Sequence, residues 1–290
     1  MKYAVNGFSM IEVMIACALS LILLQAATQT YLISQKNHDT QQALARIQEN
    51  EQLLQHAWTA LMPQVGLLGC QSTRSGQILH VLTQQLNPDD LKAGDLISLD
   101  DDTLVIHHTE PLAAMLLEDM SVPSSSLVVE RDVLDVKLGD VVLISDCTAA
   151  DLITVTHLSN RQEKTLIGHD SSANRHSDVS KTYQYGAEVS VWKREEYSIK
   201  ASSYQNTQYQ AISTLYVDDS LSGLKGEWLL GVEALNIQLQ RPIARFHWLF
   251  NSVDEVLDKP TSYLFNGEQQ DTDDRLLRHE LIQQIYLENW

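Results

Sequence analysis

The sequence predicts an α+β fold in which one long N-terminal helix packs on a β-rich globular head. No glycine or proline occurs from Phe8 to Met62, and a helix of that length would extend about 80 Å at about 1.5 Å per residue. Its first half is apolar and its second half is amphipathic. From Gln77 onward, short apolar runs with a period of two alternate with turn residues, which is typical of strands.

Size and composition are those of a globular protein with a sizeable core. The chain has 290 residues, of which 44% are hydrophobic. Its formal net charge of -18 comes from 38 Asp and Glu against 20 Lys and Arg. We therefore expect no nucleic-acid partner, because a phosphate backbone selects for basic patches.

The apolar half of the predicted helix is long enough to cross a membrane. Residues 13–33 are uncharged and would extend roughly 32 Å as a helix, which matches a hydrocarbon core of ~30 Å. Lys2 and the α-amino group precede this segment, and the next basic residue is Lys36. The positive-inside rule then places the short N-terminus in the cytoplasm and the bulk of the chain outside.

Glu12 is the only charged residue between Lys2 and Lys36. A carboxylate at the edge of a membrane helix costs a few kcal/mol unless it is paired, and a simple anchor gives no reason to keep it. Cleavage after Gly7 would supply a partner, the new amine of Phe8. Such a pair at ~4 Å in an intermediate dielectric is worth roughly 4 kcal/mol, and the carboxylate would also favour the first helical turn.

The segment from Gly7 to Glu12 resembles the type IV prepilin signature, a short leader that ends in Gly and is followed by Phe and then by an acid four residues later. The resemblance implies cleavage between Gly7 and Phe8 by a prepilin peptidase and N-methylation of Phe8. It also implies that Glu12 meets the Phe8 amine of a neighbouring subunit during assembly. Major pilins usually carry Gly and Pro in this helix, whereas this chain has neither, so we expect a continuous helix.

Four further stretches resemble PilW-type minor pilins. They are residues 43–50, 65–70, 139–147 and 230–235. The resemblance extends over about residues 1–240 and implies a type IV pilin-like fold. The expected organisation is a leader of residues 1–7, a transmembrane and assembly half of the helix over residues 8–33, an amphipathic half over residues 34–62, and a periplasmic β-rich head over residues 63–290.

Gln25, Thr28 and Gln29 lie on one face of the predicted membrane helix at i, i+3, i+4 spacing. These three polar side chains could hydrogen-bond neighbouring helices in a bundle. The alternative interpretation is that they reach the outer membrane interface.

The amphipathic half carries a stripe at helical spacing that should pack against the head. The stripe consists of Leu44, Ile47, Glu51, Leu54, Trp58 and Leu61. Pro63 ends the helix.

The head is predicted to consist mainly of strands. Candidate strands are Ile78–Leu82, Leu96–Leu99, Leu104–His107, Leu127–Glu130, Val141–Ser145, Ile153–Val155, Ala187–Trp192, Tyr197–Ser202, Ile212–Val217 and Leu235–Leu239. Two Gly-Asp turns, at Gly94 and Gly139, each introduce a similar hairpin. Residues 157–182 are predicted to form a long surface loop, residues 242–258 show no clear period, and residues 271–286 are predicted to form an amphipathic helix.

Cys70 and Cys147 lie outside the apolar run, and an even pair there is compatible with an oxidising compartment. The cysteine count and the minor pilin resemblance agree on a Cys70–Cys147 disulfide, and two free buried thiols are the alternative. Cys17 lies within the apolar run, where we expect it to act as a small apolar residue.

The sequence carries no motif that indicates catalysis. His279 and Glu280 begin a zinc-protease pattern, but Gln283 stands where the second histidine ligand is needed. His157, His169 and His176 share one segment without a metal-ligand spacing, and residues 100–102 are three aspartates that suit a solvated turn better than a calcium site. We expect no enzyme activity, no cofactor, no metal and no catalytic residue.

The expected function is that of a minor pilin of a type IV pilus, which primes, caps or promotes pilus growth. The resemblance implies four kinds of partner: other minor pilins, the major pilin, the prepilin peptidase and methylase, and a tip adhesin. It also implies storage in the inner membrane before incorporation into the pilus. The alternatives are a type II secretion pseudopilin and a membrane-anchored periplasmic binding module.

Overall fold

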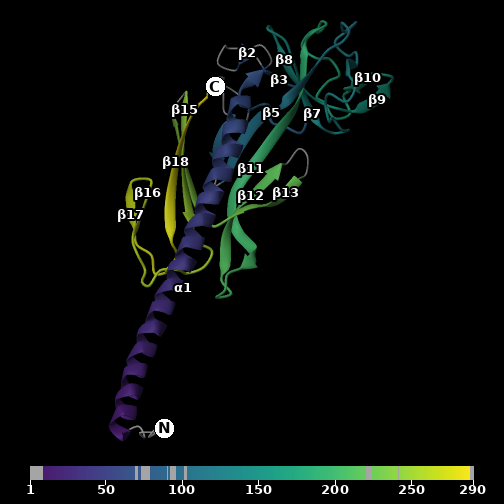
Figure 1. Cartoon of the computed structure of the whole chain (residues 1–290). Coiled ribbons are helices and arrows are strands. Elements are labelled where there is room, and N and C mark those ends of the chain that lie inside the picture. Colours follow the sequence, from purple (N-terminus) through teal and green to yellow (C-terminus); the bar gives the residue numbers. More distant parts are fainter. Residues whose placement is uncertain are drawn as a thin grey trace, which may run out of the picture.

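A computed structural model describes residues 9–68, 71–72, 79–89, 91, 96–100, 103–219, 224–240 and 242–287. It has one long helix and a β-rich head, as predicted (Figure 1). The helical elements are α1 (Met10–Leu61) and the 3-10 turn η1 (Met62–Gln64). The strands are β1 (Leu67–Leu68), β2 (Gln71–Ser72), β3 (Leu79–Val81), β4 (Ile97–Asp100), β5 (Thr103–Met115), β6 (Leu127–Glu130), β7 (Val141–Ser145), β8 (Ala150–Thr154), β9 (His157–Arg161), β10 (Lys164–Gly168), β11 (Glu188–Gln205), β12 (Ala211–Asp219), β13 (Leu224–Leu230), β14 (Val232–Gln240), β15 (Ile243–Asn251), β16 (Tyr263–Phe265), β17 (Glu268–Gln270) and β18 (Arg278–Tyr286).

α1 is continuous, and its two halves have different surroundings. The N-terminal half extends away from the head, whereas the C-terminal half lies between the strands of the head (Figure 1). The predicted stripe is confirmed at Ile47, Leu54 and Trp58, which are buried. Leu44 is 40% exposed and does not belong to the core, because the stripe meets the head only from about Ile47 onward.

Trp58 joins α1 to both sides of the head. Its ring centroid lies 5.3 Å from that of Tyr197 on β11, 4.8 Å from Phe246 and 5.5 Å from Trp248, both on β15. All four side chains belong to the main core cluster. Tilted aromatic contacts at these separations add to the stabilisation from buried area.

β11 is the central strand of an eight-stranded sheet. Along one edge it pairs with β5, and along the other edge it pairs first with β7 and then with β12. The sequence predicted two separate strands here, because Lys193 to Glu196 interrupt the apolar alternation. Both predicted hairpins are confirmed, since β4 pairs with β5 and β7 pairs with β8 in antiparallel register.

The distal lobe, formed by β3 and β6–β10, lies at the end of the head farthest from the start of α1 (Figure 1). It has a second core cluster. The predicted surface loop over residues 157–182 is wrong, because this segment contains the hairpin of β9 and β10 and then a folded stretch held by buried polar groups. The buried Asn174 accepts a hydrogen bond from Thr154 N at 2.7 Å and donates to Thr154 O at 3.0 Å. Polar residues here are satisfied inside the fold rather than by solvent.

The chain passes from the large sheet to a three-stranded sheet, β14-β15-β18, through Gly231 alone. Gly231 has φ of 80°, and a Cβ at this position would lie 2.6 Å from the carbonyl oxygen of Asn251. Its N–H donates to Ser213 O and its own carbonyl accepts from Asn251 N, both at 2.7 Å. Only glycine fits this conformation and this close approach.

The predicted C-terminal helix over residues 271–286 is wrong. β18 is a strand that pairs antiparallel with β15 along its whole length. Leu281 and Ile285 are four residues apart, a spacing that suits one face of a helix or one face of a strand equally well. Pairing with β15 makes this segment a strand rather than a helix. β15 itself lies within residues 242–258, which showed no clear period in the sequence.

His107 lies in β5 with its ring centroid 6.1 Å from that of Trp192, and only 3% of the residue is exposed. Burial, together with the nearby charges of Arg194 and His108, lowers its pKa to about 3. The unfolded chain therefore binds a proton near pH 6.5 that the folded chain does not bind until about pH 3. The stability that neutral His107 contributes is fully present above its pKa in the unfolded chain. It is lost as the pH falls from that value towards the pKa of His107 in the folded chain.

We expect Trp58→Ala to destabilise the head by about 3–5 kcal/mol, because it removes the side chain shared by both sheets and leaves a cavity. The measurement is urea unfolding of the full chain in detergent, followed by circular dichroism. Leu53→Ala is the matched control, since Leu53 is 51% exposed on the same helix and should change stability by less than about 0.5 kcal/mol. Similar midpoints for the two variants would contradict the central position of Trp58.

We expect His107→Gln to remove part of the pH dependence of stability. Between pH 7.5 and pH 5 the wild-type chain should lose about 2 kcal/mol through this site, and the variant should not. Urea unfolding of both proteins at the two pH values measures the difference, in which the other titrating groups cancel. Parallel pH profiles would mean that His107 is not buried in its neutral form.

Candidate functional site

The N-terminal half of α1 has an entirely exposed apolar surface. Every described residue up to Gln35 is exposed, including Ile15 at 55% and Leu23 at 70%. Among the described residues there is one helix long and apolar enough to span a membrane, and none of its apolar window is buried. An exposed apolar surface of this size is typical of a membrane or protein interaction site.

Glu12 belongs to a capping box at the start of α1. Ser9 is the N-cap, and its N–H donates to the Glu12 carboxylate at 2.9 Å. The sequence signal for this local role of Glu12 is the Ser-x-x-Glu pattern from Ser9, which the expectation of an assembly contact leaves aside. Gly7 and Phe8 lie outside the described residues, so cleavage and methylation there stay predictions.

Gln25, Thr28 and Gln29 are all exposed on α1. The Thr28 hydroxyl donates to Leu24 O at 2.8 Å, and Ser20 donates in the same way to Ala16 O at 2.7 Å. These hydroxyls are therefore satisfied within the helix, as an apolar environment requires. Contact of this polar face with neighbouring helices stays a prediction, and the two glutamine side chains would carry most of it.

Within the part of the chain that the structure describes, three polar contacts join α1 to the head. Lys36 forms an ion pair with Asp258, and Glu51, the polar member of the stripe, pairs with His279 on β18. One residue before Glu51, Asn50 donates to Leu230 O at 2.8 Å. The apolar half of α1 is therefore the direct extension of a segment that is bound to the head.

Cys147 is disulfide-bonded, and Cys17 is free and exposed on the apolar half of α1. Cys70, the predicted partner of Cys147, lies outside the described residues.

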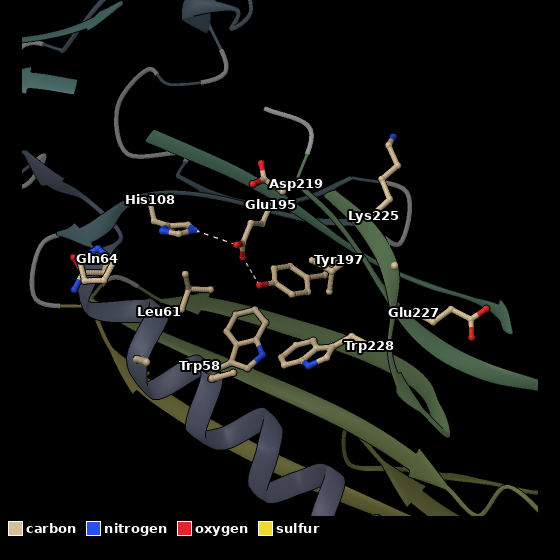
Figure 2. Close-up of a pocket in the computed structure, with 15 residues that line it drawn as sticks. Trp58, Leu61, Gln64, His108, Glu195, Tyr197, Asp219, Lys225, Glu227 and Trp228 are labelled. Carbon is tan, nitrogen blue, oxygen red and sulfur yellow. Dashed lines mark hydrogen bonds and ion pairs between the residues drawn. The ribbon is translucent and has the colours of Figure 1, made fainter. Parts of the chain in front are cut away.

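A groove of about 600 Å³ lies between the last turns of α1 and the sheet (Figure 2). One wall is formed by the α1 residues Ala57, Trp58, Ala60 and Leu61 with Gln64. The other wall is formed by His108, Pro111, Glu195, Tyr197, Val217 and Asp219, and by the β13 residues Lys225 to Trp228. This groove could not be predicted from the sequence, because its residues come from five separate segments.

Glu195 is the centre of a polar network on this wall. The Tyr197 hydroxyl donates to one carboxylate oxygen, and His108 Nε2 lies 3.5 Å from the other (Figure 2). Burial raises the pKa of Glu195, but the hydrogen bond and the charge of His108 outweigh burial and hold it below its ordinary value. Burial and the Glu195 carboxylate raise the pKa of the Tyr197 hydroxyl, which stays neutral.

A second carboxylate faces Glu195 across the sheet. Asp219 is its partner in the register of β11 and β12, so the two side chains lie on the same face. Lys193 Nζ lies 3.4 Å from Asp219 and 3.3 Å from Glu110. Burial lowers the pKa of Lys193, but Asp219 and Glu110 outweigh this and raise it, so the lysine stays charged.

The three histidines that share one segment bind protein atoms separately. His157 lies 3.3 Å from Asp170, His169 Nε2 lies 3.0 Å from Ser125 O, and His176 Nδ1 lies 2.7 Å from Asp178 O. Within the described parts of the chain, no three His, Cys, Asp or Glu side chains come together as metal ligands. Asp100 ends β4, and the two aspartates after it lie outside the described residues.

No protein-family model matches the chain, and neither the curated proteins nor the solved structures contain a significant match to it.

Proposed function

We propose that this protein is a minor pilin that assembles with other pilins through α1. The observation that carries the proposal is the division of one continuous helix into an exposed apolar half and a half that is the spine of the head. The apolar half can lie in lipid before assembly and among other helices afterwards, because both environments keep it out of water. The protein acts through assembly contacts rather than through catalytic turnover.

The proposed topology has a cytoplasmic N-terminus and a periplasmic head. The distribution of basic residues around the apolar segment supports it. The disulfide at Cys147 also supports it, since such bonds persist in oxidising compartments. The proposed partners are other minor pilins, the major pilin, the prepilin peptidase and a tip adhesin.

Glu12 is the proposed assembly contact, and the capping box shows how its roles can be separated. The capping box needs a hydrogen-bond acceptor at residue 12, which glutamine also supplies. Pairing with the Phe8 amine of a neighbour needs the negative charge. Glu12→Gln keeps the first role and removes the second, whereas Ser9→Ala weakens the cap and leaves the charge.

Gly7→Ala should block removal of the leader, because the proposed cleavage follows Gly7. Co-expression with a prepilin peptidase, followed by an immunoblot, measures the change in mobility. The wild-type chain should run faster when the peptidase is present, and the variant should not. No mobility difference for the wild-type chain would contradict the pilin proposal.

Glu12→Gln should still be processed but should enter sheared pili at about one tenth of the wild-type level or less, by loss of a charge pair. Ser9→Ala should be incorporated nearly as well as the wild type. Quantitative immunoblots of the pilus fraction measure both variants. Normal incorporation of Glu12→Gln would show that Glu12 only caps the helix.

A further inference from the structure

The groove beside Trp58 is divided into an apolar part and a charged part. Figure 2 shows His108, Glu195 and Asp219 grouped on one side, with Trp58 and Trp228 on the other. The groove is open to solvent, and its volume of about 600 Å³ is typical of sites that bind a ligand or a large side chain. Such a shape fits an occupant with an apolar stem and one polar end.

The charged part has an excess of negative charge. Among the described residues, the carboxylates of Glu110, Glu195, Asp219 and Glu227 outnumber the two lysines, Lys193 and Lys225. Lys193 pairs with Glu110 and Asp219, and Lys225 pairs with Asp218, so in the described part of the chain neither lysine is paired with Glu195. The Glu195 side chain is ionised and 23% exposed, so an occupant can reach it. A cation placed beside Glu195 would be attracted by this excess of negative charge.

The surroundings favour an organic cation over a metal ion. A hard cation requires six or more oxygen ligands, whereas the groove is bounded mainly by Ala, Leu, Val and aromatic side chains. A guanidinium is weakly hydrated, bonds to carboxylates and stacks on aromatic rings such as the half-buried Trp228. Trp58 is buried, and its indole nitrogen faces Trp228 across the groove (Figure 2). The more accessible Trp228 is therefore the ring on which a guanidinium can stack.

We propose that this groove binds an arginine side chain of a different protein, with the guanidinium on Glu195 and the aliphatic stem along the apolar wall. The net charge of -18 disfavours a second copy of this chain and favours a more basic partner. The proposal does not rest on assembly through α1, because the groove lies in the head.

The test uses N-acetyl-arginine methylamide as the probe and the full chain in detergent, labelled with fluorotryptophan. The fluorine signals of Trp228 and Trp58 should shift saturably with a Kd on the order of 1 mM. The Trp192 signal should not move. The neutral citrulline analogue should give no saturable shift, because it has the same shape without the charge.

Two pairs of variants localise the site. Glu195→Gln should weaken probe binding by about tenfold or more, while Glu118→Gln, an exposed carboxylate paired with Lys164 in another part of the head, should leave it unchanged. Gly226 lines the groove, and a Cβ there would meet no atom within 4 Å. Gly226→Leu should therefore block binding without changing any charge, and Gly226→Ala should not.

Equal binding of the citrulline analogue, or unchanged binding by both Glu195→Gln and Gly226→Leu, would overturn the proposal. A dimer that the probe dissociates would place the arginine on a second copy and would overturn the assignment to a different protein. Failure of Glu12→Gln to alter pilus incorporation has no bearing on this result, so the two proposals fail independently.

Discussion

The packing of Trp58 between two sheets is the interaction on which the head depends. One indole contacts Tyr197 from the large sheet and both Phe246 and Trp248 from the small sheet. Without it, the C-terminal half of α1 would lose the contact that it shares with both sheets. Trp58 and the buried Tyr197 also line the groove, so the core and the proposed binding surface share these residues.

Features encoded in local sequence were predictable. The absence of glycine and proline, followed by Pro63, predicted a helix that the structure confirms almost to the residue. Several strands matched because their apolar runs are short and bounded by turns, with Leu127–Glu130 and Val141–Ser145 identical to the predicted ranges. The C-terminal strand was missed because Leu281 and Ile285 fit two periods, and only pairing with β15 distinguishes them.

The two candidate sites, at Glu12 and at Glu195, also differ in how far the local sequence predicts them. Glu12 was identified from the sequence because an isolated carboxylate beside an apolar run costs free energy unless it is paired. Glu195 did not stand out, since it lies in a mixed stretch of charges that resembles an exposed turn. Its importance arises from Asp219 on the next strand and His108 on the other side, residues that no local pattern joins to it. A groove whose residues are brought together by pairing between strands that are distant in sequence cannot be predicted from local sequence motifs.

Because α1 is continuous, a movement of its N-terminal half is transmitted to the head. The described helix is continuous and is packed on the head from Ile47 to Trp58. In the proposed topology, a tilt of the apolar half in the membrane therefore turns the whole head. Membrane helices tilt by about 20° on average, and about 28 residues separate Ile33 from Leu61, or about 42 Å. A change of that size would therefore move the groove sideways by about 14 Å. Under the proposed function, membrane thickness and helix packing around the apolar half would thus set which partners the groove can reach.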